Sequence, residues 1–231
     1  MQVTTLTILK FKGKEIFWML PQMQLAKPAL EQTKGLRFFK LMGSGSKGGF
    51  SVIPDFTTFA ILCVWDNETF ADTFFNHSDL FQQLKSHSKN AWTIFMHAAN
   101  SRGSWSKQTP FTDFSETKAG IIAVITRATI KWNHVPRFWT KVPAVRRNLR
   151  QSRGLIFSIG IGEYPLFMQV TFSLWRDRSH MAQFAYKNGQ HMKAVQMTRQ
   201  RDWFREDLFA NFTPFKTLGS WNGNDPLEEH L

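Results

Sequence analysis

Residues 59–65 read Phe-Ala-Ile-Leu-Cys-Val-Trp and residues 169–175 read Gln-Val-Thr-Phe-Ser-Leu-Trp, and an aspartate follows each tryptophan within two residues. The two segments lie 110 residues apart. The likeness continues outward: Lys10-Phe11 returns as Lys131-Trp132, and Gly35-Leu36-x-Phe38 returns as Gly154-Leu155-x-Phe157. Self-similarity over so long a period indicates a duplicated domain rather than a solenoid of short repeats.

Each half predicts the same order of elements when hydrophobic periodicity and turn residues are read together. In the first half we expect, in order, a strand, a helix, two strands, a helix and a strand at Val3–Phe11, Glu15–Gln32, Leu36–Met42, Phe56–Trp65, Glu68–Ser86 and Ala91–Ala98. In the second half the same elements are expected at Gly120–Ile130, Val135–Gln151, Leu155–Ile161, Leu166–Trp175, Asp177 to about Arg199, and Leu208–Lys216. Asp177 is expected to cap the N-terminus of the second helix. The order βαββαβ is that of a ferredoxin-like unit, so the fold class is α+β with tandem ferredoxin-like repeats.

The duplication and the loop composition predict four segments. Residues 1–100 form the first repeat, 101–118 a linker, 119–218 the second repeat, and 219–231 a flexible tail rich in Asn, Gly and acidic residues. Two such repeats can pack sheet against sheet within one chain, as simpler proteins do by dimerisation.

Composition narrows the class of protein. The 231 residues are 42% apolar with 23 Phe and 9 Trp, which is typical of a globular chain, and no apolar run approaches the roughly 20 residues that span a bilayer. The N-terminal residues show no secretory signal. Cys63 is the only cysteine, which excludes an intrachain disulfide and a multi-cysteine metal site, and favours a reducing cytoplasm.

The chain carries a net charge of +12, with a pI near 10.1. Nucleic acid, an anionic membrane surface and an acidic protein are all partners that this charge suits. Charge alone does not choose among them.

Two glycine-rich patterns resemble nucleotide-binding motifs. Residues 43–48 fit G-x-G-x-x-G, but a second strand is expected to follow, whereas a dinucleotide site needs a helix there, so a hairpin connection is favoured. Residues 47–52 partly match the RNA-reading strand of an RRM domain. The strand at 56–65 is apolar on both faces, however, which disfavours base stacking.

Histidines on the predicted helices are candidate ligands. The helix from His180 to Arg199 carries an inward stripe that includes Phe184, His191, Met192 and Val195. On residue type alone, a hydrogen-bonded core histidine is favoured over a ligand. His77 falls on a similar stripe with Phe70, Phe74 and Phe81 and is the second candidate, whereas Cys63 is expected to be a small core residue.

Arg127 interrupts an otherwise apolar strand at a position where the first copy has Leu6. A buried guanidinium needs an anionic or polar partner. Two interpretations remain open: Arg127 meets such a partner, or it lies at an open strand end and reaches water.

Blocks along residues 36–215 resemble the spheroidene monooxygenase family of carotenoid biosynthesis. They are, in order, Phe39 to Gly45, Phe59 to Trp65, Thr126 to Ile130, Arg137-Phe138-Trp139, Ile159 to Pro165, Gln169 to Trp175, Phe184 to His191, Trp203-Phe204 and Glu206 to Ala210. The resemblance implies a dimeric α+β barrel haem protein, here formed within one chain.

The resemblance further implies a haem b monooxygenase that oxidises C-2 of acyclic carotenoids with O2 and reduced ferredoxin. It implies His191 as the axial iron ligand, Phe184, Met192 and Val195 as walls of the haem site, and Arg127 as a catalytic distal residue or propionate partner. The expected partners are then ferredoxin and a membrane surface, and no nucleic acid is expected. The protein is expected in the cytoplasm, either free or peripheral to the inner membrane, and it can form a homodimer. The alternatives are a haem-binding or cofactor-free barrel monooxygenase acting on another apolar substrate and, third, a basic RNA-binding protein.

Overall fold

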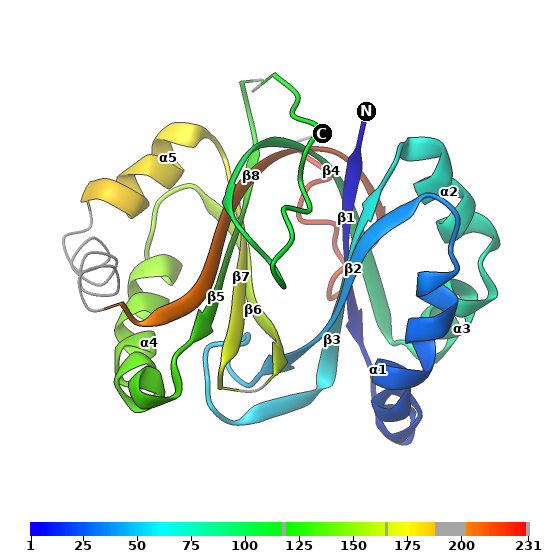
Figure 1. Cartoon of the computed structure of the whole chain (residues 1–231), viewed down its shortest axis with the longest axis horizontal. Coiled ribbons are helices and arrows are strands. Elements are labelled where there is room, and N and C mark those ends of the chain that lie inside the picture. The colour runs from blue at the N-terminus through cyan, green and yellow to red at the C-terminus, as the bar shows by residue number, and fades with distance from the viewer. Residues whose placement is uncertain (117–118, 165, 188–201, 230–231) are drawn as a thin grey trace.

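Eight antiparallel strands close into one barrel (Figure 1). The structure, a computed structural model, describes residues 1–116, 119–164, 166–187 and 202–229. The strands are β1 (Val3–Lys10), β2 (Leu36–Gly45), β3 (Pro54–Trp65), β4 (Asn90–Gly103), β5 (Ile122–Ile130), β6 (Leu155–Tyr164), β7 (Met168–Trp175) and β8 (Phe204–Gly219). Their order around the barrel is β1-β3-β2-β6-β7-β5-β8-β4. The expected fold class, tandem ferredoxin-like repeats in one α+β barrel, is confirmed.

Helices cover the outside of the barrel in two separate layers. The helices α1 (Glu15–Glu31), α2 (Glu68–His77) and α3 (Asp79–His87) lie on one side, whereas α4 (Val135–Arg150) and α5 (Arg178–Ala182) lie on the opposite side (Figure 1). A short 3-10 turn, η1 (Trp132–His134), precedes α4, and a π-helical turn, η2 (Gln183–Lys187), extends α5. Each half therefore has one helix layer over its own part of the barrel wall.

Two seams join the halves. The seam between β4 and β8 is long, with partners from Trp92↔Gly219 to Gly103↔Leu208. The seam between β2 and β6 pairs only Gly43 with Gly162 and Ser44 with Ile161. The barrel is thus closed firmly on one side and by a short contact on the other.

Backbone geometry repeats between the halves. Gly35 and Gly154 both have positive φ, +77° and +76°, and a Cβ at either would overlap the ring of Phe70 or His180. Asn67 and Asp177 are the corresponding N-caps, and each side chain accepts a hydrogen bond from the backbone N–H three residues on. The duplication seen in the sequence is confirmed in these turns, as is the predicted cap at Asp177.

Some boundaries differ from the expectation. The helix predicted at Glu68–Ser86 is two helices, because Ser78 adopts an extended conformation and its side chain caps α3 through the N–H of Phe81. A serine side chain that offers the backbone an acceptor favours such a restart over continuation. β4 and β8 are also longer than predicted, since they pair with each other across the seam.

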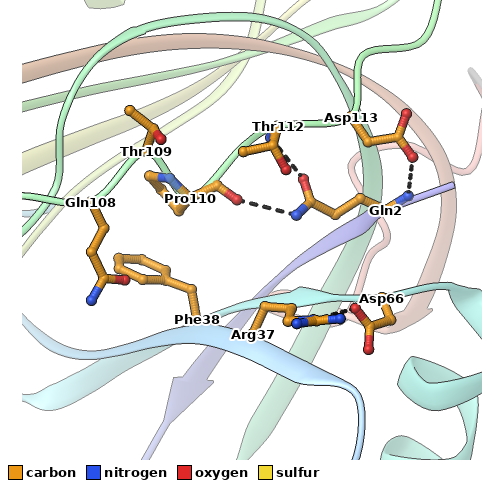
Figure 2. Close-up of a pocket in the computed structure, with 9 residues that line it drawn as sticks. All are labelled: Gln2, Arg37, Phe38, Asp66, Gln108, Thr109, Pro110, Thr112 and Asp113. Carbon is orange, nitrogen blue, oxygen red and sulfur yellow. Dashed lines mark hydrogen bonds and ion pairs between the residues drawn. The ribbon is translucent and has the colours of Figure 1, made fainter.

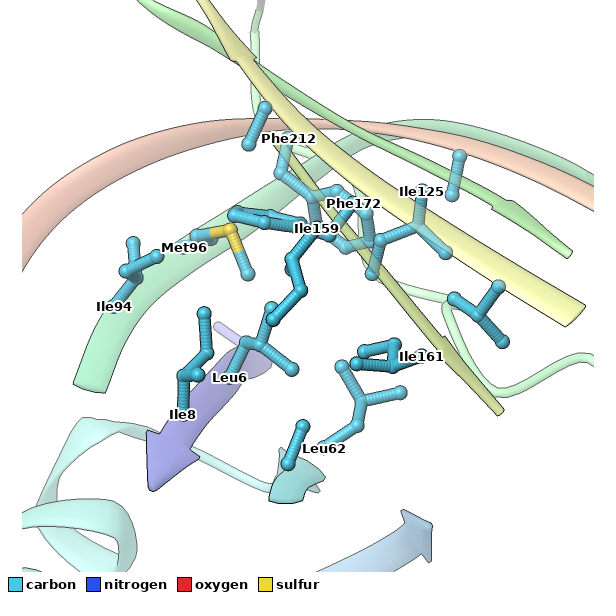
Figure 3. Close-up of a cluster of buried hydrophobic side chains, with 14 of the residues drawn as sticks. Leu6, Ile8, Leu62, Ile94, Met96, Ile125, Ile159, Ile161, Phe172 and Phe212 are labelled. Carbon is cyan, nitrogen blue, oxygen red and sulfur yellow. The ribbon is translucent and has the colours of Figure 1, made fainter. Parts of the chain in front are cut away.

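The barrel interior is filled with apolar side chains. Residues from both halves, among them Ile8, Leu62, Ile125 and Phe172, point toward one another (Figure 3). All four are 5% exposed or less, as expected for a close-packed core.

The C-terminal segment lies against the barrel, unlike the expected flexible tail. Leu227 is fully buried and belongs to the interior cluster. The Asp225 side chain accepts hydrogen bonds from the indole of Trp92 at 3.0 Å and from the hydroxyl of Thr217. The buried Leu227 and the hydrogen bonds of Asp225 together hold a segment that composition alone predicts to be flexible. The division into domains and linker stays a prediction.

Candidate functional site on the outer face of the second half

The outer face of the barrel differs sharply between the two halves. Strand register gives the corresponding positions, because Trp65 pairs with Leu36 and Trp175 pairs with Leu155. In the first half, six outward positions hold Phe39, Leu41, Phe59, Ile61, Cys63 and Phe95, which pack under α1 to α3. In the second half, the same positions hold Ser158, Gly160, Gln169, Thr171, Ser173 and Asn211. We call these six residues the polar outer face.

Among the described residues, the apolar cluster on this side is smaller than the one under α1 to α3. It consists of the buried residues Ile122, Val124, Leu149, Trp175 and Met181 with a few partly buried neighbours. Among the described residues, α4 buries only Leu149, whereas its counterpart α1 buries Met19, Ala26 and Leu30. Within the described residues, this face therefore carries smaller and more polar side chains at these six positions than its first-half counterpart.

Asn211 is buried within this face. Its side chain is 4% exposed, and its Oδ1 has no hydrogen-bond partner among the described residues. Burying an amide oxygen without a partner costs about 1–3 kcal/mol. Such a group indicates a polar partner from outside the described part of the chain.

Phe184 borders the polar outer face. Its ring lies 5.3 Å from the ring of Trp175, and it packs on the cluster under α5. Of the four residues expected to hold haem, only Phe184 is described. His191, Met192 and Val195 lie outside the described residues, so their expected roles stay predictions.

Arg127 lies on the opposite face of the sheet from Phe184. It shares the inward side of β5 with Ala123 and Ile125, and its side chain is 1% exposed. The register pairs Arg127 with Val170 and Ile8 with Ala60, so its first-half counterpart is Ile8 and not Leu6. The interpretation that Arg127 reaches water is wrong.

The partner of Arg127 is Glu206, through an ion pair from Nη1 to Oε2. Burial would raise the pKa of Glu206, but hydrogen bonds from the Lys107 backbone, Ser104 and Arg127, together with the Arg127 charge, lower it to about 2. Glu206 is therefore ionised at neutral pH. The structure does not bring Arg127 and Phe184 together, and the catalytic role expected for Arg127 stays untested.

Trp105 links this ion pair to a second one. The guanidinium of Arg127 lies 5.8 Å above the Trp105 ring, whose Nε1 donates to Glu163 at 2.6 Å, and Glu163 pairs with Lys40 at 2.9 Å. Sequence reasoning missed this network. The signal was weak, since Lys40 and Glu163 are charged residues, which are usually exposed to solvent.

The other candidate ligands do not point into this layer. His77 is exposed, contrary to the expected inward position, because α2 ends there and Phe75 takes the inner place. Cys63 is a buried core residue as expected, and burial raises the pKa of its thiol. Among the described residues, no group of three or more His, Cys, Asp or Glu side chains is placed to hold a metal ion.

A second site, a pocket of about 390 Å³, lies where β1 and β2 begin and β3 ends, next to the segment 108–113 (Figure 2). Gln2 crosses it, and its side-chain amide donates to the carbonyl of Pro110 at 3.2 Å. Arg37 and Asp66 form an ion pair on its far side. The lining is mainly polar and includes none of the residues expected to form the site.

Comparison with known proteins identifies the family. The chain is 34% identical to spheroidene monooxygenase of Rhodobacter capsulatus over 98% of its own length and 96% of that protein. The chain belongs to the spheroidene monooxygenase family. It is also 34% identical to the enzyme of Cereibacter sphaeroides, covering 100% of this chain and 72% of that protein, and 31% identical to the one of Rubrivivax gelatinosus over 85% and 75%. No protein-family model matches the chain.

Membership of the spheroidene monooxygenase family makes the chain an oxidoreductase of the monooxygenase class, as expected. Among solved structures, an aldoxime dehydratase in complex with butyraldoxime has a TM-score of 0.64 at 8% identity over 93% of this chain and 80% of the other. A second aldoxime dehydratase structure has a TM-score of 0.62 at 10% identity over 92% and 81%. At such identities the likeness shows a shared fold alone.

Two further findings bear on the alternatives. From Phe59 to Trp65 every residue of β3 is buried, so this strand offers no exposed aromatic row for stacking RNA bases. β2 runs through a turn directly into β3 with no helix between them, which agrees with a hairpin at residues 43–48 rather than a dinucleotide site. Within the described residues, no helix is both long and apolar enough to cross a bilayer.

Proposed function

We propose that this chain is a haem-dependent monooxygenase that inserts oxygen at C-2 of an acyclic carotenoid of the spheroidene type, with O2 and reduced ferredoxin as co-substrates. One oxygen atom enters the C–H bond to give an alcohol, and the other leaves as water with two electrons from ferredoxin and two protons. A second insertion at the same carbon gives a gem-diol, which loses water to a ketone. The observation that carries the proposal is the polar outer face in a chain of this family.

The described residues fit a flat group between α5 and the sheet. Thr171 and Ser173 stand where the first half has Ile61 and Cys63, so the wall is more polar there than in the first half. Phe184 and Trp175 supply an aromatic edge beside it. When bound, haem supplies the means to activate dioxygen, which protein side chains alone lack.

The chain's own residues then have separate tasks. Phe184 excludes water from the side of α5, and the hydroxyls of Thr171 and Ser173 offer hydrogen bonds within the layer. His191 is proposed to hold the iron, with Met192 and Val195 completing the wall. Arg127 is proposed to act only indirectly, by fixing β5 to β8 through Glu206, since it lies on the other face of the sheet.

Hemin titration tests the cofactor assignment. Purified wild-type protein is expected to develop a Soret band with added hemin, and His191→Ala is expected to lose it. His77→Ala is the matched control, because it removes an exposed imidazole and should leave the band unchanged. Full hemin uptake by His191→Ala would contradict the ligand assignment, and a folded wild-type protein that takes up no hemin would favour the cofactor-free monooxygenase.

The net charge of +12 supports two partners. Reduced ferredoxins are acidic electron donors, and basic proteins attract both acidic proteins and anionic lipid surfaces. Oxygenation with ferredoxin and sedimentation with anionic vesicles should both weaken as salt rises, because screening shortens the range of charge attraction to about 8 Å at 0.15 M. Salt-independent activity and binding would argue against both partners.

A further inference from the structure

An apolar groove of about 190 Å³ runs over the short seam between β2 and β6, on the outside of the barrel. Its walls come from both halves of the chain: Leu20 and Met23 of α1 on one side, and Trp139 of α4 with Leu166 on the other. The indole of Trp139 donates to the carbonyl of Leu166 at 3.2 Å, which fixes that wall. The groove exists only because the two copies meet here.

Glycines form the floor of this groove. Gly43, Gly45, Gly160 and Gly162 all line it, and Gly43 pairs with Gly162 across the seam. A Cβ at Gly43 would meet nothing within 4 Å, so this position faces open space. Glycine inside a strand weakens the strand and often marks a site where another group approaches the backbone closely. The other three positions are crossed by backbone, since a Cβ at Gly45, Gly160 or Gly162 would lie within 2.5 Å of a carbonyl oxygen of Ser51, Gly49 or Met168. At Gly43 the floor is bare, and a thin, flat chain can lie directly on the sheet there.

Several apolar side chains that line the groove are exposed to solvent. Val52, Phe56 and Tyr164 line it and are 50%, 56% and 62% exposed, and Leu20 is 39% exposed. Ile53 and Phe167, adjacent in sequence to lining residues, are 63% and 41% exposed. Contiguous exposed apolar residues mark sites of apolar ligands or lipid contact.

The loop at residues 46–53, between β2 and β3, lies next to both the groove and the polar outer face. Gly49 crosses Gly160 so closely that a Cβ at Gly49 would lie 1.7 Å from the Gly160 carbonyl oxygen. The next residue, Phe50, packs on the apolar cluster under α5. The groove and the polar outer face therefore adjoin on one surface: Gly160 and Gln169 belong to both, and Gly49 crosses over Gly160.

We propose that this seam groove binds the elongated polyene chain of the substrate, an inference that rests on the proposed function. The groove is smaller than the roughly 300–1,000 Å³ of pockets that enclose a whole small molecule, so it holds one stretch of a long chain and leaves the rest outside. The mainly polar pocket crossed by Gln2 does not suit such a chain. A polyene is narrow, flat and apolar, as the glycine floor and its walls require.

Binding of spheroidene in detergent micelles, followed by tryptophan fluorescence without any reductant, tests this site apart from catalysis. Gly43→Leu places a side chain in the open space over the floor and should raise the Kd about tenfold or more, the equivalent of losing roughly 1.4 kcal/mol of contact. Leu20→Asp puts a charge on the wall and should have the same effect. Leu25→Asp is the matched control on the same helix, at a 65% exposed position outside the groove, and should keep the Kd within about twofold.

The outcomes separate the two proposals. Wild-type Kd in both Gly43→Leu and Leu20→Asp, with near-UV circular dichroism unchanged, would overturn the groove while leaving the monooxygenase proposal standing. Groove-dependent binding without any oxygenated product, when ferredoxin and O2 are supplied, would leave the groove and overturn the function. If Gly43→Leu does not fold, the test is the comparison of the spheroidene Kd of Leu20→Asp with that of Leu25→Asp, and equal values would overturn the groove.

Discussion

Asn211 occupies in the second half the register position that Phe95 occupies in the first. Phe95 pairs with Thr5 and Asn211 pairs with Val124, at equivalent points of β1 and β5. Phe95 is fully buried against Phe75, with ring centres 5.2 Å apart, whereas the buried Asn211 Oδ1 has no partner among the described residues. Duplicated copies therefore use one backbone position for packing in one half and for a polar face in the other.

Restoring the first-half residue should close the proposed site. Asn211→Phe removes an unpaired buried oxygen but adds side-chain volume, so its free energy of unfolding is expected to stay within about 3 kcal/mol of wild type. Hemin uptake, read from the Soret band, should be lost. The reciprocal variant, Phe95→Asn, should lower the free energy of unfolding in urea by about 3 kcal/mol or more, because it leaves a cavity in a packed cluster. Normal hemin uptake by folded Asn211→Phe would place the cofactor elsewhere.

Removing the buried guanidinium should destabilise the barrel. Arg127→Met leaves Glu206 ionised beside the interior without its cation, and loss of one partner of a buried pair costs about 3 kcal/mol. Urea unfolding at neutral pH measures the effect. Arg102→Met is the control, since Arg102 is exposed and lies over the Phe209 ring. Equal stability of wild type and Arg127→Met would show that the pair contributes nothing.

Acid should remove the stability that Glu206 contributes. Its folded pKa of about 2 lies below the ordinary value of 4.5, so the charged form is favoured in the folded state. The contribution is present above pH 4.5 and is lost as pH falls toward 2. The unfolding free energies of wild type and Glu206→Gln should therefore differ most near neutral pH and converge in acid. A gap that is independent of pH would contradict the lowered pKa.

The fold was predictable because the duplication repeats local signals twice. Gly35 and Gly154 have a positive φ that glycine tolerates better than other residues, and Asn67 and Asp177 are of the residue types preferred as helix N-caps. What could not be predicted depends on distant contacts. Ser78 ends α2 and starts α3, and this break leaves His77 exposed rather than on the inward stripe.

The candidate site was predictable only in part. The inward side of Arg127 follows from its alternation with Ala123 and Ile125, but its partner Glu206 is 79 residues away and comes together with it only when β5 pairs with β8. The polar outer face had a usable signal: aligning the copies residue by residue sets Ser173 against Cys63 and Thr171 against Ile61. The shift of 110 residues already supplies this alignment, but only the strand register shows that both positions face outward under the helices.

The crossing of Gly49 over Gly160 should tolerate no side chain. Gly49 has φ of +90°, where a residue with a Cβ is strained by roughly 1–3 kcal/mol, and the added Cβ would overlap the Gly160 backbone. Gly49→Ala is therefore expected to detach the 46–53 loop from β6, with loss of the hydrogen bond from the Gly160 N–H to the Gly48 carbonyl at 2.8 Å. Faster limited proteolysis within the loop and weaker spheroidene binding should follow, since this loop walls the groove. Gly48→Ala is the matched control in the same loop, because Gly48 also has positive φ, +73°, but open space around its Cβ position, so it carries the strain without the collision. Equal proteolysis of the two variants would show that backbone strain, and not the close crossing, governs the loop.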